Sequence, residues 1–178
     1  MFRRRRMNPI PPLSADQIAV LVKANQLMAQ GKPLEAGASF TGLAATLQQS
    51  NHPRRAANLY ARAAHAFADG GNAEGALSNA RQALGLFTQT GMAPRAAMFY
   101  AHITRKMDSH GMQVQAETLR KEFSGKMAVS PAVAPARRHG LLPTSCPKCE
   151  APLHPDELIW VDENTVECEF CGTLIHSE

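Results

Sequence analysis

The sequence has few residues of the kinds that carry catalysis, and its cysteines are confined to one end. Cysteine is absent from the first 145 residues, and all four cysteines lie among the last 33 of the 178. Neither a glycine-rich phosphate loop nor a G-x-S-x-G nucleophile motif occurs, which argues against the enzyme classes that those motifs mark. Acidic residues are scarce before residue 144, where seven Asp and Glu stand against 18 Lys and Arg. We therefore expect a protein that is not an enzyme.

Long apolar segments are also missing, so the sequence predicts no transmembrane segment. The chain begins with a basic stretch that contains Arg3, Arg4, Arg5 and Arg6, but a proline-rich segment follows it where a secretion signal would have an apolar run. We expect a cytoplasmic protein whose residues 1–13 form a disordered basic arm. Two interpretations of the arm stay open: a solvated tail, or a contact with RNA or the ribosome.

The four cysteines form two C-x-x-C pairs, Cys146 with Cys149 and Cys168 with Cys171, and eighteen residues separate the pairs. This spacing is typical of a tetrahedral metal site. Four thiolates suit Zn²⁺ best and iron next, and a closed set of four leaves no position for a reactive water. The sequence therefore predicts a structural zinc site. The alternatives are a rubredoxin-like iron centre that transfers electrons, and two disulfides.

The residues around the cysteine pairs indicate a small β module. Residues 157–161 and 165–168 predict two short strands joined by a turn. Gly172 follows the second pair, where a turn needs a positive φ, whereas Glu150 stands at the matching place after the first. Two cysteine turns and a hairpin on one ion resemble a zinc ribbon. Residues 144–178 are too few to bury a core, so the metal is expected to supply the folding free energy.

The predicted ribbon is acidic, whereas the rest of the chain is basic. Lys148 is its one basic residue, against eight Asp and Glu. An acidic surface repels phosphate, so we do not expect the ribbon to bind nucleic acid. The opposite charges suggest the hypothesis that the ribbon docks on the basic part of the chain. Residues 126–143, rich in proline and alanine, predict a flexible linker between the two.

A repeat of forty residues runs through residues 14–125. Three glycines and three alanines recur at this interval, and the sequence predicts three units at about 14–50, 51–90 and 91–125, each a pair of helices. The first helix opens with a capping-box pattern at Ser14 and Gln17. The middle unit is the clearest, and its inward positions are Ala56, Tyr60, Ala63, Ala64, Phe67, Ala76, Ala80, Ala83, Leu84 and Phe87.

This alternation of small and aromatic residues resembles a tetratricopeptide repeat. The resemblance implies a mostly α fold, an array of helical hairpins with about six helices, and a groove that binds a partner protein. A plain bundle of six helices is the alternative. Arginines on the helices, with Arg81 among them, are predicted to form one basic face that suits an acidic peptide; the partner-binding candidates are Arg54, Arg55, Arg62 and Arg95. The expected function is that of an adaptor with a zinc ribbon as its second interaction module.

Overall fold

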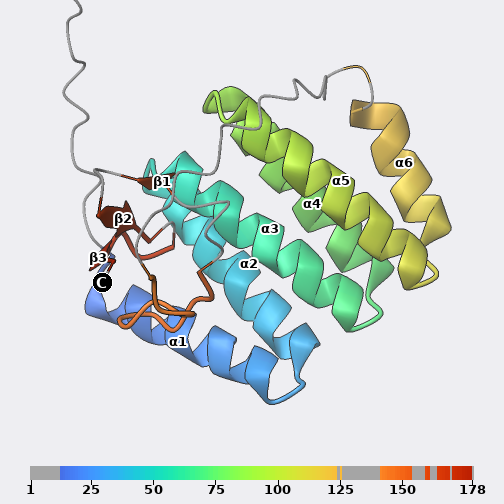
Figure 1. Ribbon diagram of the computed structural model, residues 1–178. Coiled ribbons are helices and arrows are strands. Elements are labelled where there is room, and N and C mark those ends of the chain that lie inside the picture. Colours follow the sequence, from blue (N-terminus) through green and yellow to red (C-terminus); the bar gives the residue numbers. More distant parts are fainter. Residues whose placement is uncertain are drawn as a thin grey trace, which may run out of the picture.

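The structure, a computed structural model, describes residues 13–123, 125, 141–153, 159–160, 164–168 and 170–177. The predicted basic arm, apart from residue 13, and residues 126–140 of the predicted linker lie outside this part of the chain. Six helices stand side by side in a packed array, and a small sheet follows them (Figure 1). The helices are α1 (Ala15–Ala29), α2 (Pro33–Gln49), α3 (Pro53–Asp69), α4 (Ala73–Gln89), α5 (Ala93–Ser109) and α6 (Gln113–Phe123).

Helix α1 begins where its capping-box pattern predicts, and proline opens the next two helices. At α1 the backbone N–H of Gln17 donates to Ser14 Oγ at 3.2 Å, and the backbone N–H of Ser14 donates to Gln17 Oε1 at 3.0 Å. The predicted capping box is thus formed in both directions. Pro33 and Pro53 are the first residues of α2 and α3, where a missing N–H costs no hydrogen bond.

The five turns between consecutive helices are alike, and they recur every twenty residues. Each has one residue at positive φ: Gly31, Asn51, Gly71, Gly91 and Gly111. The next residue then donates its N–H to the carbonyl five positions earlier, as Asn72 does to Phe67 at 2.8 Å. This is the Schellman pattern of helix ends. It confirms three helical hairpins within the predicted forty-residue units, and it shows that one turn type also joins the hairpins.

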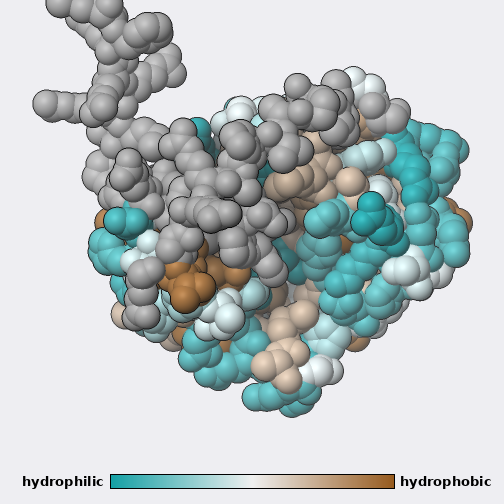
Figure 2. Space-filling model, in the orientation of Figure 1, coloured by the Kyte–Doolittle hydropathy of each residue, from teal (hydrophilic) through white to brown (hydrophobic). Residues whose placement is uncertain are grey.

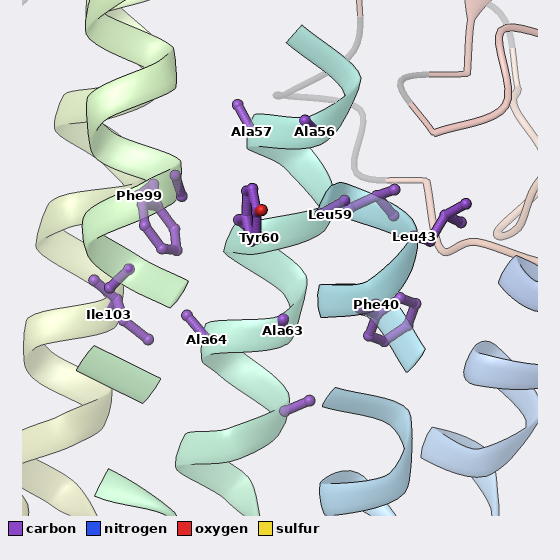
Figure 3. Packing of buried hydrophobic residues seen from close by; sticks show 14 of the residues in the cluster. Phe40, Leu43, Ala56, Ala57, Leu59, Tyr60, Ala63, Ala64, Phe99 and Ile103 are labelled. Carbon is purple, nitrogen blue, oxygen red and sulfur yellow. The ribbon is translucent and has the colours of Figure 1, made fainter. Parts of the chain in front are cut away.

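Helix α3 lies at the centre of the array, and ten of its 17 residues are buried. Figure 3 shows Ala63 directed toward Phe40 of α2, and Ala64 directed toward Ile103 of α5 on the opposite side. All four of these side chains are at most 1% exposed. Because alanines lie on both sides, neighbouring helices can approach α3 closely.

The predicted inward residues of the middle unit lie in the core as expected. All are buried except Phe67, which is half-buried and packs against the core.

The surface at the α5–α6 end of the array is mostly hydrophilic, as Figure 2 shows. No helix in the part of the chain that the structure describes is both long and apolar enough to cross a membrane.

A small antiparallel sheet follows the helices, with the strand order β1 (Ile159–Trp160), β2 (Thr165–Glu167) and β3 (Leu174–His176). The predicted hairpin is present as the β1–β2 pair, in which Ile159 lies opposite Glu167. The third strand was not predicted from the sequence. It pairs along β2 and places Ile175 opposite Val166, and both of these side chains are buried. We call the described residues from 144 to 177 the four-cysteine module.

Candidate metal centre

Two matching turns present the four cysteines. The backbone N–H of Glu150 donates to the carbonyl of Cys146 at 2.9 Å, and that of Gly172 donates to the carbonyl of Cys168 at 2.8 Å. Glu150 and Gly172 both have positive φ, 59° and 75°. The two C-x-x-C segments therefore form the same type of turn. Glu150 adopts, in the first turn, the positive-φ conformation that Gly172 adopts in the second.

The four sulfurs lie close enough to share one ion. All four cysteines are at most 1% exposed, and their sulfur atoms lie within 4.8 Å of one another. Cys146 Sγ is 3.6 Å from Cys171 Sγ, and Cys149 Sγ is 3.7 Å from Cys168 Sγ. Four sulfurs bound at about 2.3 Å to a tetrahedral zinc lie about 3.8 Å apart, so the cluster fits a metal of this kind. His176 stands outside the cluster and contacts Thr165 Oγ1 at 3.0 Å.

Protons are shared unequally among the four thiols. Hydrogen bonds from neighbouring cysteines, Cys149 first, lower the pKa of Cys146 to about 7, and hydrogen bonds from the other three sulfurs lower that of Cys171. Contacts with Cys146 raise the pKa of Cys149 and of Cys168. A cation that binds all four sulfurs as thiolates must displace the remaining protons.

Two of the predicted partner-binding arginines lie against the four-cysteine module. Arg55 is 3% exposed, and its Nη2 lies 3.9 Å from Glu167 Oε1. The guanidinium of Arg62 lies between two rings, 4.6 Å from the centre of Phe40 and 4.8 Å from that of Phe170. Burial lowers the pKa of Arg55, and it lowers the pKa of Arg62 to about 10. Arginine side chains keep their charge at neutral pH in proteins.

The other arginines are placed differently, so the structure divides the predicted basic face. Arg54 is exposed on α3 beside the buried Arg55. Arg81 forms an ion pair with Glu122, with Nε 2.8 Å from Oε2, and thereby joins α4 to α6. Arg95 is half-buried on α5. It lines a pocket of about 420 Å³ together with Arg62, and Phe170 and Pro152 of the four-cysteine module contribute to the same pocket.

Sequence reasoning missed Asn25 of α1, which is 8% exposed and donates from Nδ2 to the carbonyl of Cys149 at 2.6 Å. It lies four residues after the buried Leu21 and two before Leu27, on the face that the helical pattern marks as inward. A polar side chain on a buried face needs a hydrogen-bond partner, so Asn25 was a sign that a polar group packs against α1. Asn25 and Arg55 together show that the four-cysteine module docks on α1 and α3.

A comparison with protein families matches the helical part of the chain. Neither the curated proteins nor the solved structures contain a match to the chain. The family model of the soluble NSF attachment protein, SNAP, matches residues 20–119, which run from within α1 into α6 and end before the first cysteine. Because this match spans more than half of the 178 residues and coincides with the helical array, the chain belongs to the soluble NSF attachment protein family.

Proposed function

We propose that the protein is a non-enzymatic adaptor that binds a partner protein through its helical array. The observation that carries the proposal is the family match over residues 20–119, which is confined to an array of helical hairpins. The name of the family describes proteins that attach another protein, NSF. Repeated hairpins of this kind give extended surfaces suited to protein recognition. The proposed partner is a protein of unidentified sequence, and we assign no chemical reaction to the chain.

The four-cysteine module serves in this proposal as a zinc ribbon with one structural Zn²⁺ held by Cys146, Cys149, Cys168 and Cys171. The buried sulfurs and their spacing support this assignment. Iron fits the same ligands and is the second candidate for the metal. Reduced thiols are needed for either ion, which is why we place the protein in the cytoplasm. Arg3, Arg4, Arg5 and Arg6 lie outside the described residues, so binding of RNA or the ribosome stays a prediction.

The partner's contact is proposed at the pocket that Arg62 and Arg95 line. His102 of α5 belongs to the same pocket, as does Lys106, which pairs with Asp69 at 2.7 Å, and apolar side chains such as Phe99 form another part of the wall. This combination suits a peptide segment that carries a carboxylate next to an apolar side chain. Arg54, which is exposed on α3, is the further arginine expected to contact a bound protein.

A binding experiment with matched charge reversals tests this proposal. The full chain is used to capture proteins from a lysate of its source, the specific partner is identified by mass spectrometry, and its affinity is then measured with purified components. Arg95→Glu is expected to weaken binding by tenfold or more, because a carboxylate then faces a carboxylate. Arg105→Glu is the control, since Arg105 is exposed on the same helix but does not line the pocket.

The Arg54→Glu/Arg95→Glu double variant extends the test to α3. It is expected to bind more weakly than Arg95→Glu alone. Equal affinities for the native chain, Arg95→Glu and the double variant would refute the proposed contact. Turnover of a small molecule by the purified protein would refute the assignment as an adaptor.

A further inference from the structure

The contact between the four-cysteine module and the helices is made close to the cysteines themselves. Asn25 binds the carbonyl of Cys149, and Gln26 Nε2 reaches Glu150 Oε2 at 3.4 Å. Both bonds join residues 124 positions apart in the sequence. Helix α1 therefore contacts the first cysteine turn both at its backbone and at the side chain of Glu150.

The second cysteine turn rests on Arg55. A Cβ atom placed on Gly172 would lie 2.0 Å from Arg55 Nη2, so the guanidinium occupies the space that a side chain would take. Gly172 directly follows Cys171, and Glu167 directly precedes Cys168. Arg55 thus brings a positive charge to the cysteine cluster from α3, and Glu167 offsets part of that charge at 3.9 Å.

Arg62 is the second cation at this interface, and its surroundings are less polar. It lies between the rings of Phe40 and Phe170, and its buried Nη1 has no hydrogen-bond acceptor among the described residues. Phe170 directly precedes Cys171, so the guanidinium of Arg62 lies beside the second cysteine turn. A buried cation is costly unless an opposite charge compensates it.

A bound metal would supply that compensation. Four thiolates around one divalent ion would place a formal charge of −2 beside the two arginines, and the ion would hold together the two cysteine turns that Asn25 and Arg55 contact. We propose that Arg55 and Arg62 are the charge partners of the loaded metal centre, so that metal binding strengthens the docking of the four-cysteine module on α1 and α3. This inference rests on the proposed metal site and adds to it that metal occupancy controls the docking.

The coupling must act in both directions. If the metal strengthens docking, docking must strengthen metal binding by the same factor, because the two equilibria are linked. Removal of an arginine charge on α3 therefore weakens metal binding, although neither arginine binds the ion. Residues that support metal ligands without touching the metal typically change its affinity 10- to 100-fold.

The first measurement is the zinc affinity of the full chain, obtained at neutral pH with a reductant by competition with a coloured chelator. Arg62→Gln is expected to weaken zinc binding about 10- to 100-fold, and Arg55→Gln less, because Glu167 already offsets part of the Arg55 charge. Arg62→Lys keeps the charge and is expected to fall between the native chain and Arg62→Gln. Arg105→Gln, an exposed arginine on α5, is the control and should bind zinc as the native chain does.

The second measurement needs no variant and follows amide hydrogen exchange of the native chain with zinc and after chelation. Exchange is expected to rise in Ala15–Ala29 and Pro53–Asp69, which contact the module, and to stay unchanged in Gln113–Phe123. Equal zinc affinity in all four variants, or unchanged exchange in α1 and α3, would overturn the coupling and leave the metal site standing. A native chain that binds no zinc would refute the metal site itself, and the coupling with it.

Discussion

At the residue scale, the backbone conformation of Glu150 is the least expected feature of the four-cysteine module. Its φ of 59° lies in the left-handed region, which costs a residue with a Cβ about 1–2 kcal/mol relative to the right-handed one. Gly172 adopts the same conformation at the matching position without that cost. The hydrogen bonds of the first turn must therefore hold Glu150 in place.

Replacing Glu150 with glycine is predicted to stabilise the module. Glu150→Gly should raise its free energy of unfolding by about 1 kcal/mol, because the strain is relieved. Thermal unfolding of the zinc-loaded chain measures the effect. Gln26→Ala is the control, since it removes the contact with the Glu150 side chain but leaves the backbone as it is. A Glu150→Gly chain that melts below the Gln26→Ala chain would contradict the prediction.

His65 makes the helical array sensitive to acid. It packs edge-on against Phe99 with ring centres 5.5 Å apart, and burial lowers its pKa from 6.5 to about 4. Because the unfolded chain takes up this proton first, the contribution of His65 to stability is complete above about pH 6.5 and is lost as the pH falls toward 4. Melting temperatures of the native chain should therefore fall more steeply between pH 7 and pH 4.5 than those of His65→Gln.

The control for the His65 experiment is His52→Gln, because His52 makes no side-chain capping bond at the start of α3. Its melting temperature should follow pH as that of the native chain does. Parallel pH profiles for the native chain and His65→Gln would show that burial of His65 does not contribute to acid sensitivity.

Sequence reasoning identified the four clustered cysteines but not the residues that contact their turns. Cys146, Cys149, Cys168 and Cys171 were evident, since their spacing alone predicts a shared ion. The sequence prediction placed Arg55 and Arg54 on one basic face. Neighbouring residues of a helix point in different directions, so Arg54 lies in solvent whereas Arg55 packs against the four-cysteine module. Arg55 and Arg62 lie seven positions apart, on one face with Leu59, and this spacing was the available sign that both point inward.

At the scale of elements, close packing around α3 determines the array. Ala63 is fully buried and is directed toward Phe40 (Figure 3). Ala63→Leu is predicted to lower the free energy of unfolding by about 1–3 kcal/mol, because the added atoms force neighbouring side chains apart. Urea denaturation measures this loss. Ala101→Leu on α5 is the control, since Ala101 is exposed, and an equal loss in both variants would contradict the packing account.

The element pattern was more regular than the sequence suggested. Glycines at a forty-residue interval predicted three hairpins, and the structure has a turn with positive φ every twenty residues. Asn51 obscured the shorter interval, because asparagine tolerates this conformation but is not a reliable sign of it. The third strand of the four-cysteine module was missed because Leu174–His176 is too short for an alternating pattern to stand out.

At the scale of the whole molecule, the chain combines a helical array of the SNAP family with a cysteine module that lies against its first and third helices. A linker rich in proline predicted independent motion of the two parts, whereas opposite charges suggested docking. The structure shows the docked arrangement. Sequence patterns report local periodicity, and they carry little information on contacts between residues 124 positions apart.

Native mass spectrometry of the purified full chain, under reducing conditions, tests the central claim most directly. The account predicts a single dominant species whose mass exceeds that of the polypeptide by one zinc ion, with the zinc lost after treatment with a strong chelator. A species that carries no metal, or one that carries iron in place of zinc, would contradict it.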